Sequence, residues 1–317
     1  MLGGLAGEAA VKVRRVYRGR LAPTPSGRMH LGHARTFWLA QARARQFNGQ
    51  LILRVDDLDH VRCRNPKYLQ EIIEDLHWFG IHWDLGPFSS LGWGDLPESA
   101  YYQSRRNEAY LQAWKVLYDR GKASFLPPRT SPPALLGDIY PSKISRKDVE
   151  RALSAPHLDN DQEPIFPIHL RPSPEERSEQ LASPTGFNWR FQVPDGRVVA
   201  FTDNHLGHHE FRCGEDFGDF VVYRSDGICA YELAVVVDDH AMGVTEVVRG
   251  ADLLLSTARQ LLIYEALGLS PPEFYHCPLV TDSNGKRLAK RDDSKSLRAF
   301  RDEGVEPNDL LRMLFAS

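Results

Sequence analysis

One stretch constrains the fold of this 317-residue chain more than any other, the run from Arg20 to His33. Residues 17–22 are short and largely apolar and predict a strand, two prolines and a glycine then break regular structure, and residues 34–47 carry apolar side chains at helical spacing. A helix that begins directly after a strand offers its first amide groups and the positive end of its dipole to an anion. His30 and His33 can add donors, Gly32 between them leaves room, and we expect a phosphate to bind there.

Composition points to an ordinary globular enzyme. The chain is 42% hydrophobic and 26% charged, which excludes disordered and fibrous classes, and its formal net charge of -3 does not by itself indicate a nucleic-acid binder. No apolar stretch is long enough to span a bilayer and residues 1–16 lack the apolar core of a secretion signal, so we expect a cytoplasmic protein. The cysteines are far apart in sequence and are expected to be free thiols: Cys63, Cys213, Cys229 and Cys277.

The first part of the chain alternates strands and helices. Residues 50–59 form an apolar run that ends in carboxylates, as expected of a buried parallel strand that delivers acids to the edge where α/β sheets bind ligands. Helices are predicted from Asn65 to Phe79, ending at Gly80, and from Tyr101 to Gly121. This alternation favours a doubly wound α/β fold.

Prolines interrupt the pattern between residues 122 and 206, which predicts an insertion with short elements. A helix is expected at 146–154 and strands at 197–203 and 217–223. The α/β pattern then returns with an apolar segment, 229–240, whose periodicity fits a helix or a strand. A strand at 244–250 and a helix at 256–267, ended by a glycine, complete it.

Together these segments resemble the class I aminoacyl-tRNA synthetases, and specifically their glutamyl branch. His30 to His33 is similar to the HIGH motif, and the preceding run from Arg20 to Gly27 is similar to that of glutamyl enzymes. Arg287 to Arg291, in a glycine-containing turn rich in cations, resembles the KMSKS loop that closes on ATP phosphates. The run from Leu233 to Asp252 extends the likeness to the second half of the chain.

The resemblance implies a Rossmann-type doubly wound parallel sheet, split by a connective insertion and followed by a short helical stem-contact region. The implied parts are residues 1–121 and 207–280 for the two halves of the Rossmann domain, 122–206 for the insertion, and 281–317 for the KMSKS-like loop and stem-contact start. Relatives of this kind continue into an anticodon-binding domain, and we expect none here.

The resemblance also implies the reaction and its residues. Glutamate and ATP form glutamyl-adenylate without tRNA, with Mg²⁺ held mostly by the nucleotide. The implied catalytic residues are His30, His33 and Lys290. The implied ATP-binding residues are His30, Gly32, His33, Arg287 and Lys290. The implied glutamate-binding residues are Arg20, Ala22, Thr24, Asp56, Tyr231 and Arg249.

The side chains of the implied glutamate-binding residues suit the charges of glutamate. Arg20 and Arg249 suit a substrate carboxylate because a guanidinium binds it in two places. Tyr231 adds a hydroxyl donor, and Thr24 keeps the hydroxyl of the serine often present in the family. Asp56 departs from the usual glutamate by one methylene, so we expect a water to bridge it to the substrate ammonium group.

The acceptor implied by a catalytic half of this kind is queuosine in the anticodon loop of tRNA(Asp), with the enzyme acting as a monomer. One alternative is a truncated glutamyl-tRNA synthetase that charges tRNA(Glu). A second is a catalytically silent tRNA-binding paralogue, and a third is a nucleotidyl-transferring ligase that does not use tRNA.

Relatives commonly hold zinc in the insertion, and we expect none in this chain. The positions of their ligands are occupied by Ser142, Ile144, Phe166 and Leu170, none of which suits zinc. Nearby His157 and His169 supply at most two ligands. We expect the apolar replacements to form a small hydrophobic cluster instead.

Overall fold

The computed structural model describes residues 16–123, 139–145, 148–149, 164–173, 183–279 and 296–315. The chain begins with the predicted strand–helix–strand unit, made of β1 (Arg18–Leu21), α1 (Leu31–Gln46) and β2 (Gln50–Leu53). The two strands are parallel, with Arg18 opposite Gln50. The carboxyl ends of both strands therefore lie at one edge, next to the start of α1.

A second unit of the same kind comes late in the chain. It consists of β8 (Glu246–Gly250), α7 (Leu254–Leu267) and β9 (Glu273–Cys277), with β8 and β9 parallel. The amide of Thr245 donates to the carbonyl of Arg18 at 2.8 Å, which sets β8 beside β1. Gly268 ends α7 in the left-handed conformation, φ 68°, as its position in the sequence predicts. The two halves of the α/β fold are thus brought together across the insertion.

Helices follow β2 as predicted, with one difference. α2 spans Lys67–Trp78, whereas α3 spans Asn107–Ala123 and starts later than the predicted Tyr101. Residues 98–105 form two 3₁₀ turns, η1 (Glu98–Tyr101) and η2 (Gln103–Arg105), separated by the extended Tyr102. The ring of Tyr101 is fully buried. This residue therefore packs into the core from a 3₁₀ turn and not from a helix.

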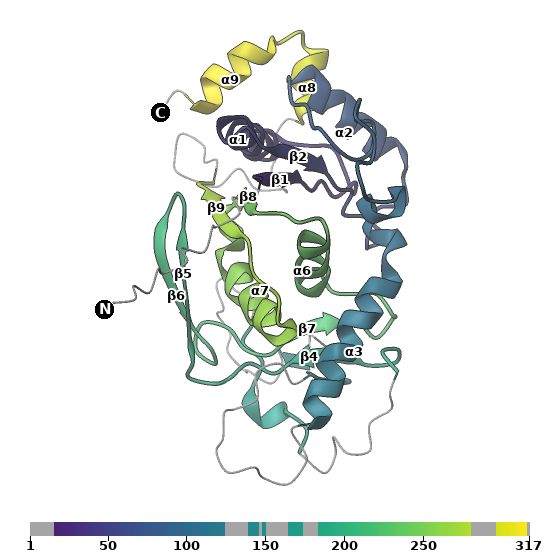
Figure 1. Ribbon diagram of the computed structural model, residues 1–317, viewed down its shortest axis with the longest axis vertical. Helices are drawn as coiled ribbons and strands as arrows, with labels where there is room; N and C mark the ends of the chain where they lie inside the picture. The colour runs from purple at the N-terminus through teal and green to yellow at the C-terminus, as the bar shows by residue number, and fades with distance from the viewer. Residues whose placement is uncertain are drawn as a thin grey trace, which may run out of the picture.

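The inserted part is antiparallel. β3 (Ile139–Ser142), β4 (Asn188–Phe191) and β7 (Phe220–Tyr223) form one sheet, with β4 in the middle. β5 (Val198–Asp203) and β6 (Gly207–Arg212) form a hairpin that projects from the body (Figure 1). A short turn, η3 (Ile168–Leu170), lies between β3 and β4. The antiparallel part therefore continues past residue 206, where we expected the insertion to end.

The remaining elements bear on two of the expectations from the sequence. The ambiguous segment 229–240 is a helix, α6 (Tyr231–Ala241). Of the helix expected at 146–154, the structure describes residues 148 and 149, which are helical. The chain closes with α8 (Leu297–Asp302) and α9 (Pro307–Phe315), which lie against α2 and α1 (Figure 1). None of the helices in the described ranges has the length and apolar character needed to cross a bilayer.

Two apolar clusters hold these parts together. One joins α3, the sheet of the insertion, α6 and α7 around Trp114, Trp189 and Phe191. The other joins the first strand–helix–strand unit to α2, α8 and α9 around Leu21, Leu53 and Leu297. The second cluster also includes Val248 of β8 and Cys277 of β9, so it spans both halves of the α/β fold.

Candidate active site

The start of α1 has the features expected of an anion site. His30 precedes the helix in an extended conformation, and its side chain does not form the N-terminal capping bond of α1. The rings of His30 and His33 stack with their centroids 3.8 Å apart. A Cβ added at Gly32 would lie 3.2 Å from two ring atoms of His30. Gly32 therefore leaves room for the ring of His30.

The segment after the KMSKS-like run returns to this motif. Ser296 forms an antiparallel β-bridge with His30, and the amide of Leu297 donates to the carbonyl of Met29 at 2.7 Å. Arg287 and Lys290 themselves lie outside the described residues. The backbone thus ties the point where that loop ends to the start of α1.

A cavity of about 610 Å³ opens between the parallel strands and the insertion. Thr24, Asp56 and Tyr231 line it, together with Phe166 and Arg190 of the insertion. Tyr231 is the first residue of α6 and its side chain is 40% exposed. The cavity therefore unites three of the predicted glutamate-binding residues.

The other predicted residues that the structure describes do not line this cavity. Arg20 and Arg249 are buried, with exposed fractions of 5% and 4%. Ala22 follows β1, and the His30–His33 motif lies at the start of α1. Tyr231 is nevertheless close enough to Arg249, Arg20 and Asp56 for their charges to act on its hydroxyl, so these four groups form one electrostatic neighbourhood.

Asp56 belongs to a buried charge network. Arg54, fully buried, donates to both oxygens of Asp56 at 2.6 and 3.2 Å and to Asp239 at 2.6 Å. Asp239 also pairs with Arg20 at 3.4 Å, and Asp238 lies 4.0 Å from Arg54. Burial raises the pKa of Asp56 to about 6, although the charge of Arg54 acts to lower it. Two arginines and three aspartates thus form one buried network, which reaches the cavity at Asp56.

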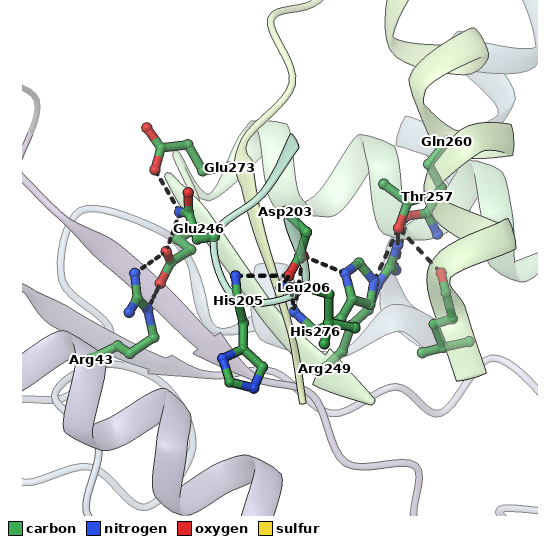
Figure 2. A network of polar contacts seen from close by, with 12 residues as sticks. Arg43, Asp203, His205, Leu206, Glu246, Arg249, Thr257, Gln260, Glu273 and His276 are labelled. Carbon is green, nitrogen blue, oxygen red and sulfur yellow. Dashed lines mark hydrogen bonds and ion pairs between the residues drawn. The ribbon is translucent and has the colours of Figure 1, made fainter. Parts of the chain in front are cut away.

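Arg249 has a different environment. Its Nε donates to His276 at 3.1 Å, its Nη1 to the amide oxygen of Gln260 at 2.9 Å, and its Nη2 to the hydroxyl of Thr257 at 2.7 Å. Figure 2 shows these side chains converging on the guanidinium from β9 and α7. Among the described residues no carboxylate pairs with Arg249. Since buried charges are normally paired, this guanidinium has the character of an anion-binding group.

The comparisons with known proteins decide the family. The model of the catalytic domain of class I tRNA synthetases for glutamate and glutamine (E and Q) matches residues 16–316. The chain belongs to this family. It is accordingly a class I aminoacyl-tRNA synthetase-type ligase domain, whose reaction uses ATP.

The relatives of this synthetase domain fall into two groups. A glutamyl-Q tRNA(Asp) synthetase of Nitratidesulfovibrio vulgaris is 43% identical over 91% of this chain and 82% of its own length. One of Symbiobacterium thermophilum is 42% identical over 92% and 84%. A glutamate–tRNA ligase of Hydrogenobaculum is 36% identical over 94% of this chain but only 57% of its own length.

A solved structure supports the fold of the domain. The crystal structure of the glutamate–tRNA synthetase from Elizabethkingia anophelis superposes with a TM-score of 0.74 at 26% identity. The match covers 94% of this chain and 61% of that one. The α/β catalytic-domain fold implied by the sequence is therefore confirmed.

Sequence reasoning on this synthetase domain missed the partners of its predicted site residues. Arg54 is the counter-ion of Asp56, and Asp239 is shared by Arg54 and Arg20. Arg54 and Asp56 are two positions apart in an extended segment, so their side chains lie on the same face, a signal readable from the sequence. The pairing of Asp239 joins residues far apart in the chain and carried no such signal.

The insertion contains the expected apolar cluster. Ile144 and Leu170 pack against Tyr140, Val149 and Phe166, and Phe166 is 3% exposed. The prediction of a small hydrophobic cluster at these positions is confirmed, whereas the prediction that the protein holds no zinc stays a prediction. All four cysteines are free thiols, as expected, and three of them are buried.

Proposed function

We propose that this chain activates glutamate with ATP and transfers the glutamyl group to queuosine in the anticodon loop of tRNA(Asp). The observation that carries the proposal is the 42–43% identity to glutamyl-Q tRNA(Asp) synthetases over more than four fifths of their length. The carboxylate of glutamate attacks the α-phosphorus of ATP and pyrophosphate leaves. A hydroxyl group of queuosine then attacks the acyl carbon, an ester bond forms, and AMP leaves with the electron pair of the broken bond.

In this proposal Arg249 and Arg20 receive the side-chain carboxylate of glutamate. Arg249 lacks a carboxylate partner in the described part of the chain, so the substrate supplies the missing negative charge. Tyr231, at the cavity wall, adds a hydroxyl. Asp56 attracts the ammonium group, and because Arg54 already binds both of its oxygens, a water completes the contact.

His30, Gly32 and His33 bind the phosphates of ATP in this proposal. In this proposal the stacked imidazoles and the first turn of α1 stabilise the charge that develops on the α-phosphate, which is the main protein contribution to phosphoryl chemistry. Arg287 and Lys290 neutralise the departing pyrophosphate. Magnesium travels with the nucleotide on phosphate oxygens, which it prefers as ligands.

Labelled glutamate and ATP, supplied with different tRNAs, test the proposal. We expect label to enter tRNA(Asp) that carries queuosine, and not the same tRNA made without the modification. Label in tRNA(Glu) alone would favour the second candidate, a glutamyl-tRNA synthetase. That candidate draws support from the 36% identity to glutamate–tRNA ligases.

We further propose a cytoplasmic monomer. Free cysteines suit a reducing compartment, and tRNA is processed there. The elution volume of the purified protein tests the monomer directly, since a dimer would elute at twice the mass of 35.9 kDa.

A further inference from the structure

A chain of polar contacts joins the β5–β6 hairpin to Arg249. Asp203, at the end of β5, lies 2.7 Å from Nδ1 of His276, and Nε2 of His276 accepts from Nε of Arg249 at 3.1 Å. Both side chains are buried, with exposed fractions of 2% for Asp203 and 0% for His276. Figure 2 shows the three side chains in a row from the hairpin to the parallel sheet. The sequence offered no sign of this arrangement, and the proposed function does not use it.

Asp203 fixes the tautomer of His276. Its carboxylate accepts from the amides of His205 and Leu206, at 2.9 and 2.8 Å, and from the amide of His276 itself. Burial acts to raise the pKa of Asp203, but these donors outweigh it and hold the pKa below its ordinary value. An ionised carboxylate facing Nδ1 requires a proton on that nitrogen. Nε2 is then left with the lone pair that Arg249 needs.

His276 is therefore a neutral acceptor. Burial, and then the positive charge of Arg249, lower the pKa of His276 to about 4. A proton on Nε2 would also point at the Nε–H group of Arg249. The imidazole accordingly orients the guanidinium without adding charge of either sign.

The other two partners of Arg249 are neutral as well. The hydroxyl of Thr257 lies 3.2 Å from the carbonyl of Leu253 and 3.1 Å from the unprotonated Nε2 of His276, either of which can accept its proton, and its oxygen accepts from Nη2. Gln260 turns its amide oxygen to Arg249 and donates its nitrogen to the carboxylate of Glu232 at 2.8 Å. Gln260 thus stands between the guanidinium and the nearest acid of α6.

Counting donors shows what remains for a ligand. A guanidinium has five N–H groups, and three of those of Arg249 are used. As far as the described residues go, two N–H groups and the whole positive charge are left, which matches a carboxylate and does not match the neutral amide of glutamine. A carboxylate in place of the imidazole would have neutralised the charge of Arg249. The preference for glutamate over glutamine would then have been lost.

We propose that His276 is a positioning residue for glutamate selection: held by Asp203 as the Nδ1–H tautomer, it orients Arg249 and leaves its charge for the substrate carboxylate. The inference rests on the proposed function for the identity of the substrate. It assigns a role to the hairpin as well, because Asp203 reaches the amino-acid site from there.

Glutamate-dependent pyrophosphate exchange, without tRNA, tests the role in three variants. In His276→Phe, which keeps a ring but removes the acceptor, we expect KM for glutamate to rise roughly tenfold or more while KM for ATP stays within about twofold. His276→Gln retains an oxygen near the place of Nε2 and should recover most of the loss. His205→Phe is the matched control, since the ring of His205 stacks on Tyr275 and its amide contact to Asp203 is kept.

An unchanged KM for glutamate in a folded His276→Phe protein would overturn the inference, and so would a His276→Gln variant as impaired as His276→Phe. Nitrogen NMR of the wild-type histidines gives a reading that needs no substrate and no variant. We expect the Nδ1–H tautomer of His276 at pH 7, and an Nε2–H tautomer or an imidazolium would overturn the inference. Exchange absent in the wild type, with the expected tautomer present, would instead contradict the proposed function.

Discussion

The guanidinium of Arg54 holds the carboxylate of Asp56 at both oxygens, with Nε 2.6 Å from Oδ1 and Nη2 3.2 Å from Oδ2. The two residues lie on the same face of the segment that follows β2, and Asp56 lines the cavity. A glutamate at this position would carry its carboxylate one methylene farther. Asp56 is thus tied to its own arginine, and in the proposed function its charge attracts the ammonium group of glutamate.

Acidification is expected to weaken glutamate binding. Because burial raises the pKa of Asp56 to about 6, the carboxyl gains a proton as the pH falls through that value and loses its attraction for the ammonium group. KM for glutamate should be flat above neutral pH and then rise by up to roughly tenfold per pH unit below the pKa. His276, with a pKa of about 4, stays neutral in this window. Exchange kinetics between pH 8 and pH 5, in one buffer series, give the profile.

Asp56→Asn is the control for this assignment. It keeps the shape of the side chain and cannot ionise, so KM should be raised at pH 8 and should no longer change with pH. A wild-type KM that stays flat down to pH 5 would remove Asp56 from ammonium binding.

Arg249→Lys is expected to impair the use of glutamate far more than that of ATP. Lysine offers a point charge and cannot keep the contacts to His276, Gln260 and Thr257 together with two N–H groups for the substrate. The loss should be about 1.5–3 kcal/mol, or roughly ten- to hundredfold in kcat/KM for glutamate. Arg197→Lys is the matched control, because Arg197 pairs with Glu265 at the surface. Equal kinetics for the two variants would place the carboxylate of glutamate elsewhere.

Gly32→Ala is expected to lower the activity without lowering the stability of the fold. Alanine favours the helix by about 1 kcal/mol over glycine, so the free energy of unfolding should stay the same or rise. Its Cβ, however, would lie 3.2 Å from the ring of His30 and displace it, and exchange should fall roughly tenfold. Gly27→Ala, in the loop that precedes α1, meets no atom within 4 Å and should leave exchange unchanged. Full exchange activity in Gly32→Ala would show that catalysis does not depend on the position of the His30 ring.

The opening motif could be predicted from the sequence because it depends on local rules. An apolar run marks β1, prolines mark the loop, and helical spacing marks α1, each without reference to the rest of the chain. Gly268 marks the end of α7 in the same way. Recognition of the motif then supplied most of the site. The glutamate-binding set came from the resemblance, and the structure adds the positions of its members.

The antiparallel strands were harder to predict. β6 reads Gly-His-His-Glu-Phe-Arg and alternates between partly and fully exposed positions, so no apolar face marks it. β3 contains Pro141, which argues against a strand, yet it lies at the edge of its sheet, where a missing amide is tolerated. The Asp203–His276–Arg249 contacts join distant segments, and only the tertiary fold brings them together.

The cluster around Phe166 predicts that the insertion is stable without zinc. Phe166→Ala removes a ring that is 3% exposed and should lower the free energy of unfolding by about 3–5 kcal/mol, as measured in urea. Metal analysis of the purified wild-type protein should find no zinc, and a chelator should leave its melting temperature unchanged. One tightly bound equivalent of zinc per chain would contradict this prediction.

The most direct test of the central claim locates the transferred glutamate. Queuosine-containing tRNA(Asp) from which the 3′-terminal adenosine has been removed is incubated with the protein, ATP and labelled glutamate, and then digested with a guanosine-specific nuclease. We predict that the shortened tRNA is labelled as fully as the intact one and that the label stays with the anticodon-loop fragment. Label that disappears with the terminal adenosine would contradict the account, because it would place glutamate on the acceptor end.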